Sequence, residues 1–310
     1  MHVVVTLGVP EQLSSGPKDI KELAVACGAH AESLARVMRH LIVKGLFEEP
    51  SPGRFGLNEE ARELLSPGAK VGMNLEGFGG RMAYAWGSLL AAVRTGEPAY
   101  HTIFGKPYWE DLAANPKIAD EFDELMGPGH DGLDPDILVS GWQGVRRIAD
   151  VGGGTGLLLA AVLRAHPDVD GLLIDLPSVV AKSAAVFQSA GVAGRATTVG
   201  QSFFDPLPPC MDVYMMKSVR ADWPDREAGA ILKRCADAAR PSGGRVVLLS
   251  GVSPDEDGPA PPELLMMVLV GGKGRTLSEF GELARAAGLE VSATGRNRSG
   301  RFIVECRVIP

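Results

Sequence analysis

Apolar positions recur at helical spacing in two successive segments near the start of the chain, "DIKELAVACG" and "AESLARVMRHLIVKGLF". In the first segment the apolar residues share one face until Gly28 ends the predicted helix. The stretch "FEEPSPGRFGL" follows, and its turn residues Pro52 and Gly53 predict a short hairpin. Helix, turn, helix and hairpin in this order form a winged-helix pattern.

The winged-helix pattern has two interpretations. A DNA-binding domain would place Arg36, Arg39 and His40 in a major groove. Acidic neighbours such as Glu32 and Glu49 favour a packing or dimerisation module instead. The net charge of −7 also argues against nucleic-acid binding, because phosphate affinity comes mostly from clustered Lys and Arg.

The pattern changes further along the chain. Residues 72–140 show helical spacing broken by Gly and Pro, whereas strand and helix patterns alternate after about residue 145. The predicted strands are 147–151, 171–175, 196–200, 211–217 and 244–250, with two late strands near 289–295 and 301–308 that form an antiparallel ending. Such alternation predicts an α/β fold, with a mostly parallel sheet covered by helices on both faces.

Composition narrows the class of protein. The four cysteines are far apart and form no CxxC pair, which predicts reduced thiols and no metal site. No apolar run approaches the length of a membrane span, and the start "MHVVVTLGVPEQL" lacks the basic region of a signal peptide. We therefore expect a cytoplasmic protein that does not bind membranes.

The stretch "IADVGGGTGLLLAAVLRAHP" reads as strand, glycine turn and helix. Its glycines allow a tight turn at a helix N-terminus, which carries a partial positive charge. The next predicted strand, "GLLID", ends at Asp175, and a carboxylate there can accept hydrogen bonds from both hydroxyls of a ribose. A glycine turn that binds no ligand is the alternative.

These motifs resemble those of the S-adenosylmethionine-dependent small-molecule O-methyltransferases. "DVGGGTG" resembles the family's methionine-binding loop and "IDLP" its ribose-binding strand end, while "FFDPLP", "DWPD" and "GGKGRT" match further stretches. The resemblance covers almost the entire chain. It implies a winged-helix dimerisation domain (1–70), a helical linker and substrate-pocket segment (71–140), and a Rossmann-like domain with a seven-stranded sheet (141–310). It also implies a homodimer.

The resemblance implies a binding site for S-adenosylmethionine. The matching residues are Asp150, Gly152, Gly154, Gly156, Asp175, Ser202, Phe203 and Lys217. The family's "GDFF" carries an Asp that accepts a hydrogen bond from the adenine amino group, but this chain has "GQSFF", with Ser202 in that position. Loss of such a charge-assisted hydrogen bond weakens binding by about 1.5–3 kcal/mol. Cofactor binding is therefore expected to be retained, weakened or vestigial.

The family's acid–base residues are missing. The usual base is a His directly before the Asp-Trp pair, where this chain has Ala221, and all six histidines precede residue 167. The acids that support this base align with Ser250 and Gly274. General-base catalysis is worth about 10²–10⁴ in rate, so its loss affects hydroxyl methylation strongly.

Candidate pocket residues follow by analogy with the family. Apolar members of the set are Trp86, Met126, Met215, Met266 and Met267, and candidate polar contacts are His130, Tyr84, Arg220 and Ser250. Each polar candidate has an alternative role, as a solvated loop residue, a surface ion pair, a packing residue or a strand cap. A shaped apolar pocket can hold a flexible substrate in a reactive conformer.

Three functional hypotheses follow for a natural-product (secondary-metabolite or antibiotic) biosynthetic protein. The first is a cyclase or pericyclase with an O-methyltransferase fold, which promotes a Diels-Alder-type cyclisation of a bulky, apolar, polyketide-like substrate without methyl transfer. The second is an S-adenosylmethionine-dependent O-methyltransferase (a transferase) that methylates a small-molecule hydroxyl by proximity. The third is a catalytically silent binding partner.

Overall fold

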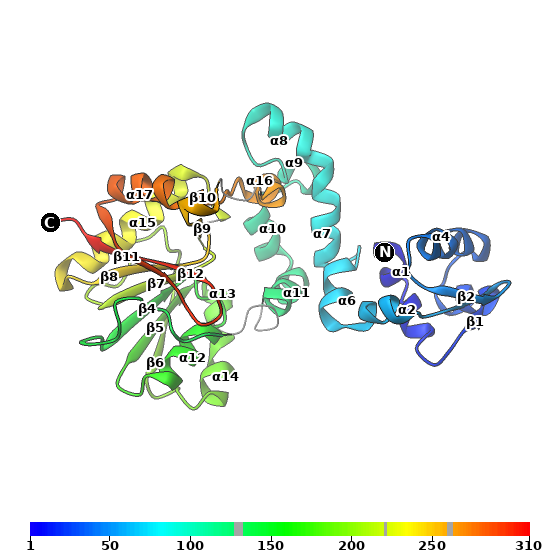
Figure 1. Ribbon diagram of the computed structural model, residues 1–310, viewed down its shortest axis with the longest axis horizontal. Coiled ribbons are helices and arrows are strands. Elements are labelled where there is room, and N and C mark those ends of the chain that lie inside the picture. The colour runs from blue at the N-terminus through cyan, green and yellow to red at the C-terminus, as the bar shows by residue number, and fades with distance from the viewer. Residues whose placement is uncertain (127–132, 220–221, 259–262) are drawn as a thin grey trace. The chain divides into compact units, whose positions relative to one another are not determined.

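The computed structural model describes residues 1–126, 133–219, 222–258 and 263–310 and divides the chain into two compact units (Figure 1). The amino-terminal unit comprises Met1–Gly87 and Trp109–Met126, and the sheet unit comprises Ser88–Tyr108 and Gly127–Pro310. The division into three parts at residues 70 and 140 remains a prediction.

The amino-terminal unit contains the winged helix predicted from the sequence. Helix α3 (Ile20–Ala26) begins where the Asp19 carboxylate accepts a hydrogen bond from the Lys21 amide, and α4 (Ala31–Val43) follows. Strands β2 (Glu48–Ser51) and β3 (Arg54–Gly56) form the hairpin, and the short β1 (Lys18–Asp19) pairs with β3. The helix-turn-helix-hairpin prediction is confirmed.

The positive side chains of α4 are paired. Arg36 lies within ion-pair distance of Glu32, and Arg39 forms an ion pair with Glu49 at 3.0 Å. These pairs reduce the positive charge that α4 offers to a phosphate backbone.

The amino-terminal unit has further helices and a hydrophobic core. These helices are α1 (His2–Thr6), α2 (Val9–Gln12), α5 (Glu59–Arg62), α6 (Pro67–Met73), α7 (Phe78–Ala85), most of α10 (Tyr108–Ala114) and α11 (Pro116–Met126). Val4, Leu23, Met38 and Phe55 are buried in this core. No helix among the described residues is long and apolar enough to cross a membrane.

The sheet unit is built on seven strands in the order β11-β12-β8-β7-β4-β5-β6. Their bounds are β4 (Arg147–Val151), β5 (Asp170–Asp175), β6 (Ala196–Gly200), β7 (Val213–Lys217), β8 (Arg245–Leu249), β11 (Leu289–Arg296) and β12 (Phe302–Val308). Strands β4 to β8 are parallel, and β12 runs antiparallel to both β8 and β11. The predicted α/β fold and its antiparallel ending are confirmed, and β7 begins two residues later than predicted.

Helices cover both faces of this sheet (Figure 1). Helices α12 (Leu157–Ala165) and α14 (Ser183–Ser189) cover one face, and α15 (Asp225–Ala239) and α17 (Leu277–Ala286) cover the other. Side chains alternate along each strand, so the neighbours Met215 and Met216 belong to opposite core clusters. Shorter elements of the unit are α8 (Leu89–Thr95), α9 (His101–Phe104), α13 (Pro177–Val180), α16 (Leu264–Val270), β9 (Val252–Ser253) and β10 (Arg275–Thr276).

Candidate functional site

The glycine loop leaves the carboxyl end of β4 and leads into α12. Gly152, Gly154 and Gly156 have positive φ values of 69°, 61° and 84°, a conformation that side chains with a Cβ atom disfavour. The Gly152 amide donates a hydrogen bond to the Ile174 carbonyl at 2.8 Å. A Cβ atom at Gly154 would meet no heavy atom within 4 Å, so open space lies beside this part of the backbone.

Asp175 ties the end of β5 to this loop. Its carboxylate accepts a hydrogen bond from the Gly154 amide at 2.8 Å and another from the Leu176 amide at 2.7 Å. The two motifs expected to hold a nucleoside and its methionine part therefore meet at the carboxyl edge of the sheet. This is where ligands bind in open parallel sheets.

Asp150 lies beneath the glycine loop and is 1% exposed. Neither of its carboxylate oxygens has a hydrogen-bond partner among the described residues. Burial raises the pKa of Asp150 to about 7; the charge of Asp175 adds to this shift, and the Lys217 ammonium opposes it. A buried carboxylate without a partner is costly, and a cationic ligand group would relieve that cost.

Aromatic rings lie beside the loop. A Cβ atom at Gly152 would approach the Phe203 ring to 3.4 Å and the Val219 side chain to 2.6 Å. Phe203 also contacts Phe204, with centroids 5.1 Å apart, and its centroid lies 6.0 Å from that of Trp223. Segments from three strand ends thus converge around the first glycine of the loop.

The altered adenine stretch is held by local hydrogen bonds. The Ser202 hydroxyl accepts from the Phe204 amide at 3.2 Å, and the Gln201 side-chain amide donates to the Pro206 carbonyl at 3.0 Å. The Gln201 backbone amide donates to the Asp175 carbonyl at 2.9 Å. Neither side chain supplies the negative charge that the family has here.

Strained backbone marks the carboxyl ends of β7 and β8. Ser218 and Ser250 have φ values of 61° and 83°, which is uncommon for residues other than glycine. The Ser250 hydroxyl accepts a hydrogen bond from the Arg301 guanidinium at 2.7 Å. Arg301 and Lys217 line one narrow cavity. Two positively charged side chains therefore lie near each other at the carboxyl edge of the sheet, which the sequence alone did not indicate.

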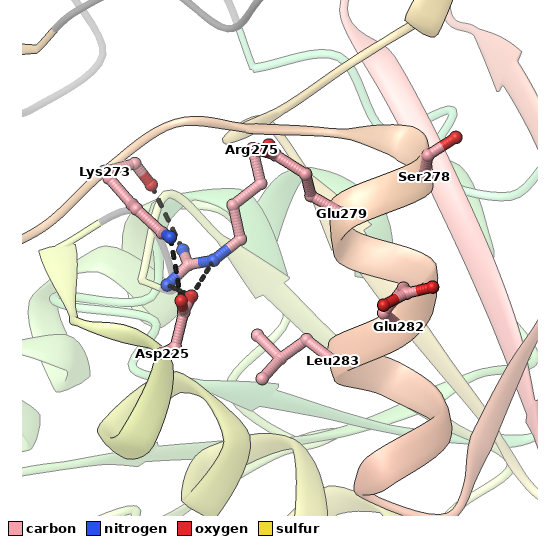
Figure 2. Close-up of a pocket in the computed structure, with 7 residues that line it drawn as sticks. All are labelled: Asp225, Lys273, Arg275, Ser278, Glu279, Glu282 and Leu283. Carbon is pink, nitrogen blue, oxygen red and sulfur yellow. Dashed lines mark hydrogen bonds and ion pairs between the residues drawn. The ribbon is translucent and has the colours of Figure 1, made fainter.

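A buried arginine holds the "DWPD" segment in place (Figure 2). Arg275 is 1% exposed and donates hydrogen bonds to the Asp225 carboxylate at 2.7 Å and to the Trp223 carbonyl at 3.0 Å. Lys273 forms an ion pair with the other oxygen of Asp225 at 2.7 Å. The side chains of Asp225, Lys273 and Arg275 line an open hollow of about 430 Å³ beside α17. The motifs "DWPD" and "GGKGRT" therefore contact each other, although Gly274 contributes no side chain.

Asp222 is a residue that the sequence did not single out as a candidate. It is half-buried, and its carboxyl pKa is raised to about 7, chiefly by burial and further by the charge of Glu263. Its position directly after Ala221, which the family resemblance aligns with a catalytic His, was the available signal.

The structure describes the positions of five further predicted site residues. Tyr84 and Trp86 belong to the amino-terminal unit and are 53% and 44% exposed. Met215 is fully buried among the aliphatic side chains that face α12 and α14, because its strand position points into the core. Met266 and Met267 are half-buried on α16.

Other candidates lie outside the described residues. They are His130, Arg220, Ala221 and the side chain of Met126. Their roles stay predictions. No group of three or more His, Cys, Asp or Glu suited to a metal ion occurs in the described ranges.

Two family matches cover most of the chain. Residues 86–290 match the O-methyltransferase domain, and residues 1–67 match the O-methyltransferase dimerisation domain. The chain therefore belongs to the O-methyltransferase family whose catalytic domain follows a dimerisation domain. The predicted family is confirmed.

Individual relatives give this membership its context. The chain is 39% identical to the 2,7-dihydroxy-5-methyl-1-naphthoate 7-O-methyltransferase of Streptomyces carzinostaticus, over 94% of this chain and 89% of that one. It is 34% identical to aclacinomycin 10-hydroxylase RdmB of Streptomyces purpurascens, over 94% and 81%. The crystal structure of NcsB1 from neocarzinostatin biosynthesis, in complex with S-adenosylmethionine and 2-hydroxy-5-methyl naphthoic acid, superposes with a TM-score of 0.88. That match has 38% identity and covers 99% of this chain and 94% of NcsB1.

Proposed function

We propose that this protein transfers a methyl group from S-adenosylmethionine to a hydroxyl of a small aromatic metabolite in natural-product biosynthesis. The observation that carries the proposal is the hydrogen bond between the Gly154 amide and Asp175, which joins the glycine loop to the ribose-binding strand end. When bound, S-adenosylmethionine supplies an electrophilic methyl group on a positively charged sulfur.

The residues around the glycine loop fit this cofactor. Asp150 offers two carboxylate oxygens without a partner in the described structure, and the methionine part of the cofactor carries an ammonium and a sulfonium. Each oxygen of the Asp175 carboxylate has two lone pairs, and ribose hydroxyls are donors that suit such an acceptor. Phe203 and Trp223 offer apolar surface for the base, whereas Ser202 lacks the usual charge.

The substrate class follows from the relatives. The Streptomyces carzinostaticus enzyme is named for a dihydroxynaphthoate, and a phenazine O-methyltransferase of Lysobacter antibioticus is 34% identical over the entire chain. A bulky aromatic hydroxyl compound is therefore the substrate that we propose. The dimerisation-domain match supports a homodimer.

Methyl transfer has better support than the cyclisation predicted from the sequence. The relatives named above act, by their names, as O-methyltransferases or, in the case of RdmB, as a hydroxylase, and none of these is named as a cyclase. The replacement of three acid–base positions by Ala221, Ser250 and Gly274 motivated the cyclisation hypothesis, and it is also compatible with methylation by proximity or with another base.

Calorimetric titration with S-adenosylmethionine and S-adenosylhomocysteine tests the proposal. We expect dissociation constants in the micromolar range. With 1,4-dihydroxy-2-naphthoic acid as the substrate, we expect mass spectrometry to detect a product that is one methyl group heavier. The Asp175→Ala variant should bind the cofactor more weakly, because it loses both the amide contacts and the ribose contacts. Absence of binding up to millimolar cofactor would overturn the proposal and return the cyclase and the silent partner to consideration.

A further inference from the structure

Asp222 occupies the carboxyl edge of the sheet directly after β7. Its backbone amide donates a hydrogen bond to the Val219 carbonyl at 3.3 Å, which holds Asp222 close to Val219. The Val219 side chain lies against Gly152, the first glycine of the cofactor loop. Asp222 is therefore hydrogen-bonded to a residue that contacts this loop.

The residues after Asp222 are held rigidly. Arg275 binds the Trp223 carbonyl and the Asp225 carboxylate, and the ring of Pro224 would lie 3.0 Å from a Cβ atom at Gly271. A side chain whose flanking residues are fixed in this way loses little additional freedom when it contacts a substrate.

The surroundings of Asp222 suit a proton acceptor. Tyr108 of α10 and Glu263 before α16 lie close enough to Asp222 for charge interactions. The pKa of the Asp222 carboxyl is raised chiefly by burial and further by the charge of Glu263. The pKa of the Tyr108 hydroxyl is also raised chiefly by burial, and the charge of Asp222 adds to that shift. Asp225, on the same segment, is neutralised by Arg275 and Lys273. A carboxyl that titrates near neutral pH is matched to general-base work.

We propose that Asp222 is the catalytic base of this enzyme and replaces the His that the chain lacks at Ala221. This inference rests on the proposed methyl transfer. The substrate hydroxyl gives its proton to an oxygen of Asp222 as its own oxygen forms the bond to the methyl carbon. The bond between that carbon and the sulfonium sulfur breaks, and its electron pair stays on sulfur as a neutral thioether.

The test compares Asp222→Asn with Glu263→Gln and with Asp168→Asn, an exposed aspartate at the opposite edge of the sheet. With 1,4-dihydroxy-2-naphthoic acid, Asp222→Asn should lower kcat about 10²-fold and leave cofactor affinity unchanged. Glu263→Gln should keep kcat but move the acidic limb of the pH–rate profile to lower pH, because a neighbouring negative charge is removed. Asp168→Asn should behave as the wild type.

A second readout does not depend on turnover. With ¹³C-labelled aspartate carboxyls, two NMR resonances should titrate near pH 7, those of Asp150 and Asp222. The resonance that disappears in Asp222→Asn should shift when 1,4-dihydroxy-2-naphthoic acid is added without cofactor. A purely structural carboxylate would not respond to the ligand. If Asp222→Asn keeps the wild-type kcat and pH profile, or if the resonance ignores the ligand, the base assignment is overturned.

The two proposals fail in different ways. Normal cofactor binding with full activity of Asp222→Asn refutes only the base assignment and leaves methyl transfer standing. Absence of cofactor binding in the wild type refutes methyl transfer itself, and the base assignment falls with it.

Discussion

Binding of S-adenosylmethionine should tighten as the pH rises through 7, because Asp150 must lose its proton before it can pair with a cationic ligand. In the unliganded fold this carboxyl is fully buried and accepts no hydrogen bond from the described residues. Burial raises its pKa from the ordinary 3.8 to about 7. A cation placed beside Asp150 stabilises the charged form and lowers this pKa again.

The structure sets the size of the effect. The raised pKa corresponds to about 4 kcal/mol that disfavours the charged form, and pairing with a bound cation offsets this cost. About one tenth of Asp150 is ionised at pH 6 and about nine tenths at pH 8. The cofactor dissociation constant should therefore be about tenfold larger at pH 6 than at pH 8, and about half a proton should be released per cofactor at pH 7.

Calorimetry in buffers of different ionisation enthalpy measures this proton release directly. The slope of the observed enthalpy against the buffer's ionisation enthalpy gives the number of protons released. Asp150→Asn should abolish the pH dependence, because an amide has no proton to lose in this range. S-adenosylhomocysteine lacks the sulfonium, so a smaller release with this ligand would assign the sulfonium as the partner, and an equal release would assign the ammonium.

A flat affinity between pH 6 and 8, with a zero slope in every buffer, would refute this reasoning. It would mean that Asp150 is already ionised without the cofactor or stays protonated beside it. The first case would overturn the raised pKa of Asp150, and the second would exclude a charge pair between Asp150 and the cofactor.

Three further predictions concern stability and cofactor affinity. Arg275→Met should lower the free energy of unfolding by about 2–4 kcal/mol in urea titrations, because buried hydrogen bonds are lost. Lys273 is exposed, so Lys273→Met should lower it by less than about 1 kcal/mol, and equal losses for the two variants would contradict the role of burial. Gly152→Ala should unfold at a lower temperature than Gly154→Ala. Both glycines have positive φ, but only at Gly152 would the added Cβ atom meet a side chain, that of Val219 at 2.6 Å. The reverse order of unfolding temperatures would contradict this geometry. Asp175→Asn should weaken cofactor binding by about 1.5–3 kcal/mol in calorimetry with little change in the thermal midpoint, and an unchanged affinity would remove Asp175 from the site.

The sequence determined the fold and the cofactor loop of this protein. Strand and helix periodicities along the chain come from side chains that face a core, and they located every strand of the main sheet to within two residues. The glycines at 152, 154 and 156 were recognisable because only glycine adopts their backbone conformation without strain. Family motifs joined these pieces into one architecture, which the family matches confirm.

Only the tertiary structure decided what surrounds each side chain. Met215 and Met216 look alike in the sequence. In the strand, Met215 is buried in the core that faces α12 and α14, whereas Met216 is buried in the core that faces α15 and α17. The sequence did not single out Asp222, yet burial and the charge of Glu263 raise its pKa to about 7. Burial and charge proximity depend on residues that are remote along the chain, and no local pattern records them.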